Sequence, residues 1–151
     1  MDIKIDDLQS EQVICLLEEH LGDMYGTSPE ESVHALDVEA LRAPELTFFS
    51  AWRGEKLMGC VAIKKLSEKE AELKSMRTSK SARNEGVASQ LLQHAIATCR
   101  HRGYKTLSLE TGSDDYFKPA RRLYEKFGFE YCLPFGHYQA DSFSQFMTRA
   151  V

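Results

Sequence analysis

The stretch from position 83 to 88 reads Arg83-Asn84-Glu85-Gly86-Val87-Ala88 and stands between a strand pattern and a helix pattern. The helix is indicated by apolar residues at helical spacing, which are Val87, Leu91, Leu92, Ala95, Ile96 and Cys99. A helix N-terminus carries unpaired N–H donors and about half a positive charge. Gly86 lets the backbone approach a ligand closely, Ala88 is small, and Arg83 adds a cationic fork. We therefore expect a phosphate-binding loop at this point.

Two other phosphate-binding motifs fit the sequence less well. A P-loop needs Gly-Lys-Ser/Thr, and a dinucleotide-binding fold needs Gly-x-Gly-x-x-Gly after an early strand; the chain has neither. The six residues alone leave a plain loop-to-helix turn open as an alternative, because short motifs often arise by chance.

The regions on both sides of this loop alternate between strand and helix patterns. Residues 2–6 predict a short strand, Ser10 predicts the cap of a helix through His20, and Gly22 and Gly26 are expected to break that helix. A second helix is expected after Pro29, and residues 37–45 read as irregular. Residues 46–52 and 56–65 predict a hairpin around Gly54.

The rest of the chain predicts three helix or strand segments and two final strands. Residues 71–78 read as a strand with Ala71, Leu73, Ser75 and Arg77 on one face. Gly103 is placed to end the long helix. A strand is expected over 104–111, a helix over 119–127, and strands over 129–133 and 143–150. This order predicts one mixed α/β domain spanning residues 1–151.

Composition narrows the function classes. The chain has 151 residues and a formal net charge of −4, so it lacks the basic excess that is typical of nucleic-acid-binding proteins. Its N-terminus has no signal-peptide pattern, and no apolar run approaches the ~18 residues of a membrane span. We therefore expect a cytoplasmic protein. The four cysteines form no CxxC pair, and we expect buried free thiols at Cys15, Cys60 and Cys99 rather than a disulfide or metal site.

A second motif follows about 30 residues after the first. It reads Ala120-Arg121-Arg122-Leu123-Tyr124-Glu125-Lys126-Phe127-Gly128-Phe129. Together the two stretches resemble the acetyl-CoA-binding motif Arg-x-x-Gly-x-Ala and the motif Ala-x-x-Leu-Tyr-x-x-x-Gly-Phe of the GNAT superfamily of N-acetyltransferases. Leu109-Glu110-Thr111-Gly112 and residues 132–138 are also similar to a bacterial YsnE-like subgroup of that superfamily.

The resemblance implies a fold and a co-substrate. The expected fold is a mixed, mostly antiparallel sheet flanked by helices and splayed between the strands at 71–78 and 104–111. Acetyl-CoA would bind along the first of these strands and at the loop. The implied residues are Met76, Arg77, Thr78, Arg83, Asn84, Glu85, Gly86, Val87, Ala88 and Ser89. One departure is Phe117, which stands where the family often has an asparagine.

The resemblance also implies catalytic residues for acetyl transfer to a primary amine of a small molecule or peptide. Tyr124 holds the family's position for the acid that protonates the departing sulfur, with packing as the alternative role. Glu72 and Glu110 are candidates for the general base, and solvated or ion-paired strand residues are the alternative for both. The histidines on predicted helices, His20, His34, His94 and His101, are expected at the surface, and His137 is a weak candidate.

Two further points stay open at the level of sequence. A non-catalytic acyl-CoA-binding module on the same scaffold is the alternative function, and a homodimer is one expected assembly. The acceptor is not readable, although Glu72, Glu110, Asp114 and Asp115 favour a cationic amine.

Overall fold

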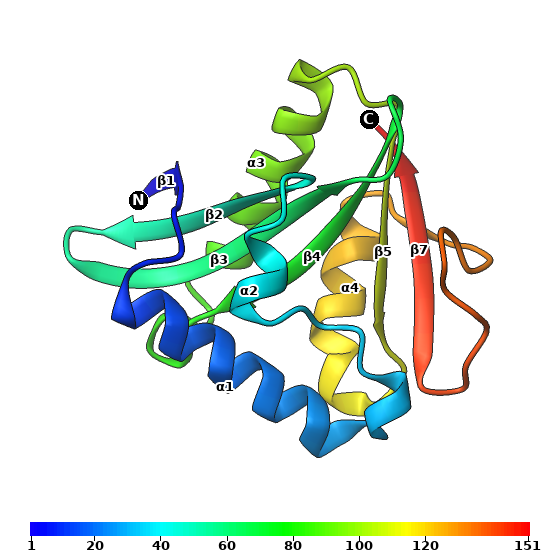
Figure 1. Cartoon of the computed structure of the whole chain (residues 1–151), viewed down its shortest axis with the longest axis horizontal. Helices are drawn as coiled ribbons and strands as arrows, with labels where there is room; N and C mark the ends of the chain where they lie inside the picture. Colours follow the sequence, from blue (N-terminus) through cyan, green and yellow to red (C-terminus); the bar gives the residue numbers. More distant parts are fainter.

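The structure, a computed structural model, describes all residues from Met1 to Val151. One seven-stranded sheet runs through the molecule in the order β1-β2-β3-β4-β5-β7-β6. Only the β4–β5 pair is parallel. The strands are β1 (Asp2–Ile5), β2 (Leu46–Arg53), β3 (Lys56–Lys65), β4 (Glu70–Thr78), β5 (Thr106–Gly112), β6 (Glu130–Tyr131) and β7 (Ser144–Ala150). The expected mixed, mostly antiparallel α/β fold is confirmed (Figure 1).

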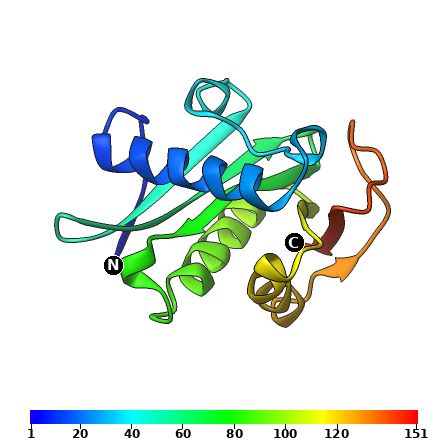
Figure 2. The same cartoon turned by 90° about the horizontal axis from the view of Figure 1, so that it is seen from below.

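Four helices cover the two faces of this sheet. They are α1 (Glu11–Thr27), α2 (Val38–Leu41), α3 (Val87–His101) and α4 (Lys118–Lys126), and single 3-10 turns lie at Glu30–Ser32, Lys80–Ala82 and Asp115–Phe117. Figure 2 shows α1 on one face of the sheet and α3 on the other. None of the helices is long and apolar enough to cross a lipid bilayer.

Two hydrophobic clusters hold the layers together. The larger cluster packs α3 and α4 on the sheet, with Leu91, Leu92, Leu107, Leu109 and Met147 almost fully buried. The smaller one packs α1 and α2 on β2 and β3. The long helix was predicted correctly because its buried residues are those of the 3.6-residue pattern, and Gly103 follows its end with φ +83°.

The N-terminal third differs from the sequence-based expectation. Ser10 caps α1 as predicted, but Gly22 and Gly26 do not break the helix, which continues to Thr27. An isolated glycine weakens a helix by only about 1 kcal/mol, and the packing of α1 on the sheet outweighs that cost. The expected second helix is a single 3-10 turn, and the region expected to be irregular contains α2, capped by Asp37.

Two of the expected buried thiols are buried. Cys60 and Cys99 have no exposed surface, and burial raises the pKa of Cys60 to about 12 and of Cys99 to about 11. Cys15 contradicts the expectation because it lies on the exposed side of α1. All four cysteines are free.

Candidate active site

A β-bulge in β4 lies next to the point where the sheet opens. Cys60 of β3 pairs with Arg77, but Ala62 pairs with Lys74, so Ser75 and Met76 together face one residue of β3. Ser75 has φ +53°, outside the strand region. The extra residue reverses the alternation of the strand, and Arg77 therefore turns toward α1. The prediction that Arg77 shares a face with Ala71 and Leu73 is wrong, because the period of two assumes an unbroken ladder.

Just before the bulge, β4 and β5 separate. Their pairing covers only Glu70–Leu73 with Thr106–Leu109, after which no ladder joins them. A cavity of about 570 Å³ lies at this gap and reaches from α1 to the N-terminus of α3 and to α4. The splayed opening expected from the family resemblance is therefore present.

The loop at one end of the cavity has the backbone of an anion site. Asn84 and Gly86 adopt left-handed conformations, with φ +63° and +78°, and α3 begins at Val87. The first helical hydrogen bond joins the Gln90 N–H to the Gly86 carbonyl, so the N–H groups of residues 87–89 lie ahead of the ladder. The residues of this segment that line the cavity are Arg83, Asn84, Gly86, Val87, Ala88 and Ser89.

Glu85 is the exception in that segment. It does not line the cavity; its Oε1 accepts a hydrogen bond from Arg53 Nη1 at 2.9 Å. Arg53 ends β2, so this exposed ion pair ties the loop to the β2–β3 hairpin and turns the carboxylate outward. An outward carboxylate leaves the helix N-terminus free of a competing negative charge.

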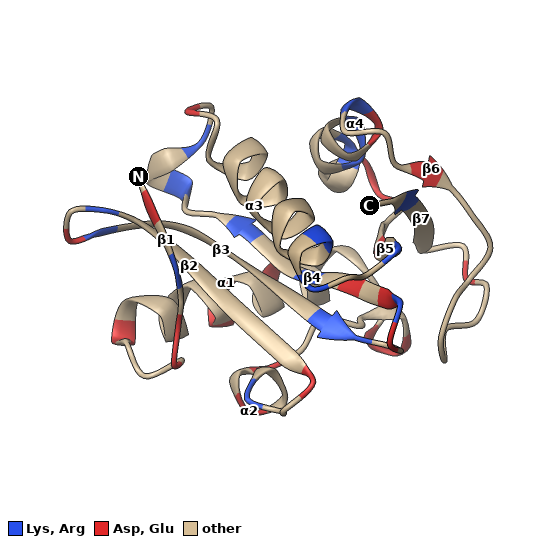
Figure 3. Cartoon of the chain, turned by 90° about the horizontal axis from the view of Figure 1, so that it is seen from above, with Lys and Arg blue, Asp and Glu red and all other residues tan.

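The predicted residues on β4 all line the cavity. Met76 and Thr78 lie beside the gap, and Arg77 joins the strand to α1. Arg77 Nη2 donates to Glu19 at 2.6 Å and to Asp23 at 2.8 Å. The sequence of α1 contains acidic residues, red in Figure 3, and no lysine or arginine. Arg77, together with Lys80 at 3.4 Å from Glu19, supplies the positive charge at this helix. The hydrogen bonds from Arg77 hold the pKa values of Glu19 and Asp23 below their usual range.

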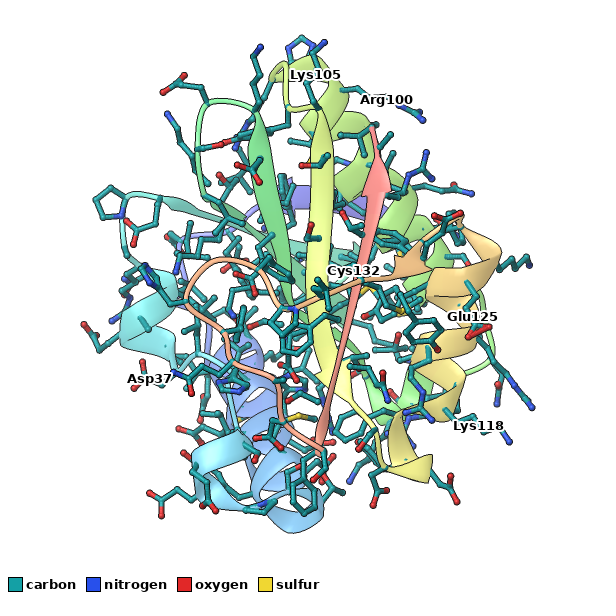
Figure 4. The ribbon with its side chains drawn as sticks, turned by 90° about the vertical axis from the view of Figure 1, so that its right-hand side faces the viewer. Asp37, Arg100, Lys105, Lys118, Glu125 and Cys132 are labelled. Carbon is teal, nitrogen blue, oxygen red and sulfur yellow. The ribbon has the colours of Figure 1, made fainter.

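Tyr124 reaches the cavity from α4. Its side chain is buried against Phe129 but also lines the cavity opposite β5. Burial, and then the nearby Glu110 carboxyl group, raise the pKa of the phenol above its usual value. The hydroxyl therefore stays protonated at neutral pH and can donate. Figure 4 shows the opposite orientation for Lys118 and Glu125 of the same helix, which project away from the sheet.

Glu110 is a carboxyl group with unusual acidity. It lines the cavity from β5, and no lysine, arginine or histidine forms an ion pair with it. Burial is the main cause that raises its pKa, to about 7; the Ser144 hydroxyl and the Lys74 ammonium counteract this only in part. A carboxyl group that titrates near neutrality can accept a proton and release it again.

Glu72 belongs to a buried network that the sequence did not reveal. Its side chain is only 3% exposed, and its Oε2 accepts from Lys74 Nζ at 3.2 Å and from the Tyr138 hydroxyl at 2.5 Å. Lys74 also donates to the Tyr138 oxygen at 2.8 Å. Tyr138 comes from the loop between β6 and β7, 66 residues away from Glu72, so no local pattern could have identified this contact.

A second bond fastens the same loop across the cavity. Asp141 accepts from the Ser32 hydroxyl at 2.5 Å, which joins the β6–β7 loop to the segment that follows α1. His34 packs edge-on against Tyr138 and lines the cavity with His20. Both histidines are half-buried, which departs from the expected surface positions, and His34 lies in a loop rather than a helix. Burial lowers the pKa of His20 to about 4 and lowers that of His34 as well, so both are neutral at pH 7.

The remaining candidates stay outside the cavity or offer no polar group. His94 packs edge-on against Phe49, and His101 and His137 are exposed. Phe117 lies in the cavity wall, where its ring packs against Tyr116 and offers no hydrogen bond in place of the asparagine that the family often has.

One cavity is thus surrounded by a splayed parallel strand pair, a bulged strand, an open helix N-terminus and a buried tyrosine. The acetyltransferase (GNAT) family model matches residues 13–129. The chain therefore belongs to the GNAT acetyltransferase family.

Individual relatives agree with this assignment. The chain is 56% identical over all of its 151 residues to YsnE of Bacillus subtilis (strain 168), an N-acetyltransferase of uncharacterised function, and covers 100% of that protein. An acetyltransferase structure from Streptococcus agalactiae is 19% identical with a TM-score of 0.76, the match covering 99% of this chain and 98% of that one. A GNAT acetyltransferase from Elizabethkingia anophelis with acetyl-CoA bound is 16% identical with a TM-score of 0.67, over 99% and 97% of the chains.

Proposed function

We propose that the protein transfers the acetyl group of acetyl-CoA directly to a primary amine. This proposal rests on one continuous cavity, which is lined by the helix N-terminus at Gly86 and also by Tyr124 and Glu110. One end offers N–H groups to a pyrophosphate, and the other offers a proton donor beside a proton acceptor. The family supports the same assignment, because a GNAT structure with acetyl-CoA bound has this fold.

The binding part of the proposal assigns the pyrophosphate to the N–H groups of residues 84–89. Arg83 lines the same end of the cavity and has no acidic partner, so its guanidinium is available for a phosphate oxygen. Because the β4–β5 ladder ends at Leu73, the backbone groups of β4 that follow it have no strand partner on the side of the gap. These groups would hold the pantetheine arm and polarise the thioester carbonyl.

The chemical part of the proposal assigns the proton transfers. Glu110, with a pKa of about 7, accepts the proton that the amine loses as its nitrogen forms the new C–N bond. Tyr124 donates its phenol proton to the sulfur as the C–S bond breaks, and solvent returns that proton. Glu72 is less suited to be the base, because Lys74 and Tyr138 already occupy its Oε2.

The experiment is free-thiol release from acetyl-CoA by the purified protein with a broad panel of primary amines. We expect amine-dependent release of CoA and a product heavier by one acetyl group in mass spectrometry. Tight binding of acetyl-CoA without release for any amine would favour the alternative function, a non-catalytic acyl-CoA-binding module. Absence of binding would contradict both.

A further inference from the structure

Both acidic and basic side chains line the cavity. Its acidic residues are Glu72 and Glu110, and its lysine and arginine residues are Lys74, Arg77 and Arg83. His20 and His34 are neutral at pH 7 because burial lowers the pKa of both. The class of acceptor depends on which of these charged groups are free to bind a ligand.

The cations near the acceptor are already paired. Lys74 is bound to Glu72 and Tyr138, and Arg77 is paired through Nη2 with Glu19 and Asp23, although its buried Nε has no partner. Arg83 has no acidic partner, but it lies with the phosphate-binding loop, past the end of β4. Thr78 at that end lies six positions after Glu72, which corresponds to roughly 20 Å of strand. An acceptor carboxylate beside Glu72 would therefore meet only cations whose charge a carboxylate of the protein already balances.

The carboxylates, in contrast, keep unused capacity. Both hydrogen bonds of Glu72 within the protein end on Oε2, so Oε1 remains able to accept from a ligand. Glu110 has no cationic partner at all. The buried hydroxyl of Ser75, which also lines the cavity, lacks a hydrogen-bond partner. The two carboxyl groups can accept from a ligand that brings donors, and the Ser75 hydroxyl can accept from it or donate to it.

The strand register places the two carboxyl groups on one face. Glu72 pairs with Ser108 in the parallel β4–β5 ladder, and Glu110 follows Ser108 by two residues. Residues two apart on a strand share a face, so both side chains leave the sheet in the same direction. Strand geometry gives a separation of their Cα atoms of about 8 Å, which rises where the strands part. A short molecule can therefore contact both carboxylates at once.

We infer that the acceptor is a short diamine or polyamine. One amino group reacts beside Glu110, while a second, protonated amino group donates to Oε1 of Glu72. This inference rests on the proposed acetyl transfer and specifies its substrate class. It also excludes α-amino acids and other amines with a nearby carboxylate as good acceptors.

Three compounds with the same four-carbon skeleton test the inference: butane-1,4-diamine, butylamine and 4-aminobutanoate. They carry the same reacting amine, and their fourth carbon bears an ammonium group, is a methyl group or is a carboxylate. We expect kcat/KM for the diamine to exceed that for butylamine by about tenfold or more, since charge-assisted hydrogen bonds are worth at least that factor. We expect 4-aminobutanoate to be the poorest acceptor.

The Glu72→Gln variant sharpens the test. It removes the partner of the second amino group and leaves the Lys74 ammonium unpaired. We expect the preference for the diamine over butylamine to fall toward one and the relative rate with 4-aminobutanoate to rise. Glu18→Gln makes the same carboxylate-to-amide change at an exposed residue outside the cavity. We expect this control to keep the wild-type order.

The two proposals fail in different ways. Equal rates for the diamine and butylamine, or a preference for 4-aminobutanoate in the wild-type protein, would overturn the diamine assignment and leave acetyl transfer intact. If no amine is acetylated, the proposed enzymatic function fails. Calorimetric titration of the three compounds into CoA-loaded protein then decides on the ligand class: tighter binding of the diamine supports it, and equal or weaker binding overturns it.

Discussion

The ring of Phe117 lies directly on the backbone of Gly112. A β-carbon at Gly112 would be only 2.1 Å from Cδ2 and 2.2 Å from Cε2 of Phe117. Gly112 ends β5 and Phe117 precedes α4, so this contact sets how closely α4 approaches the strand that carries Glu110. The glycine is therefore required by packing rather than by an unusual φ angle.

We predict that Gly112→Ala destabilises the protein. Phe117 has to move to make room, and overpacking of this kind costs roughly 1–3 kcal/mol. The free energy of unfolding in urea measures the effect. Gly22→Ala is the matched control: its new β-carbon meets nothing within 4 Å, and alanine is the better helix former, so we expect a gain of about 0.5–1 kcal/mol. A Gly112→Ala protein as stable as wild type would show that the ring is free to shift.

A further prediction concerns Gly86. Gly86→Glu should abolish acetyl-CoA binding in a folded protein, because the new carboxylate lies at the helix N-terminus that is proposed to hold the pyrophosphate. The position also has φ +78°, which strains any side chain. Isothermal titration calorimetry with acetyl-CoA measures the affinity.

Gly54→Glu separates charge from backbone strain. Gly54 has φ +60° in the β2–β3 turn, and a β-carbon there also meets nothing within 4 Å. This control carries a similar conformational cost but lies outside the cavity. We expect it to bind acetyl-CoA like the wild type. An equal loss of affinity in both variants would point to strain and contradict the assignment of the pyrophosphate.

The sequence predicted the parts of the fold that local patterns determine. The strand Lys56–Lys65 and the helix starting at Val87 match the expected ranges, since alternation and helical spacing report directly on burial. The bulge at Ser75 was not predictable, because it depends on how β4 pairs with β3. It turned Arg77 toward α1, so an error of one residue in register changed the role expected for a side chain.

The candidate site also contains some residues that local motifs predict and others that only tertiary contacts bring together. The loop at Gly86 and the position of Tyr124 follow from motifs within the chain. Lys74 and Tyr138 were missed, since their significance arises only when the β6–β7 loop folds back onto β4. The pKa of Glu110 likewise depends on burial by several elements, and no neighbouring residue in the sequence indicates it.

Glu110 should give the protein a pH dependence near neutrality. Its pKa is raised to about 7, so the fraction able to act as a base increases as the pH rises through 7. We predict that kcat/KM rises over the same range and that Glu110→Gln removes this inflection. Rate measurements between pH 5.5 and 8.5 on both proteins decide the point. The same inflection in the variant would assign the titration to another group.

The free energy of unfolding should decrease with pH, whereas kcat/KM is predicted to increase. The folded-state pKa of Glu110 lies above the unfolded value of about 4.5, so its contribution is fully present below pH 4.5 and is lost as the pH rises through 7. The loss amounts to about 3 kcal/mol at most. We therefore predict that Glu110→Gln shows a smaller decline in the free energy of unfolding between pH 4.5 and 8 than the wild type. A parallel decline in both proteins would contradict the burial of an ionisable group here.

The last prediction separates the two roles open to Tyr124. Tyr124→Phe removes only the phenol oxygen, so the packing on Phe129 and the affinity for acetyl-CoA should persist. Turnover should fall, because the protonated hydroxyl is proposed to donate to the departing sulfur. A positioned acid typically contributes ~10²–10⁴-fold, so even the smallest effect is measurable as free-thiol release. Tyr131→Phe, which removes an exposed hydroxyl bonded to Glu125, is the control and should keep the wild-type rate.

A change confined to KM would mean that Tyr124 contributes equally to ground-state and transition-state binding. A wild-type rate in Tyr124→Phe, measured where chemistry limits turnover, would make Tyr124 a packing residue and leave the assignment at Gly86 unaffected.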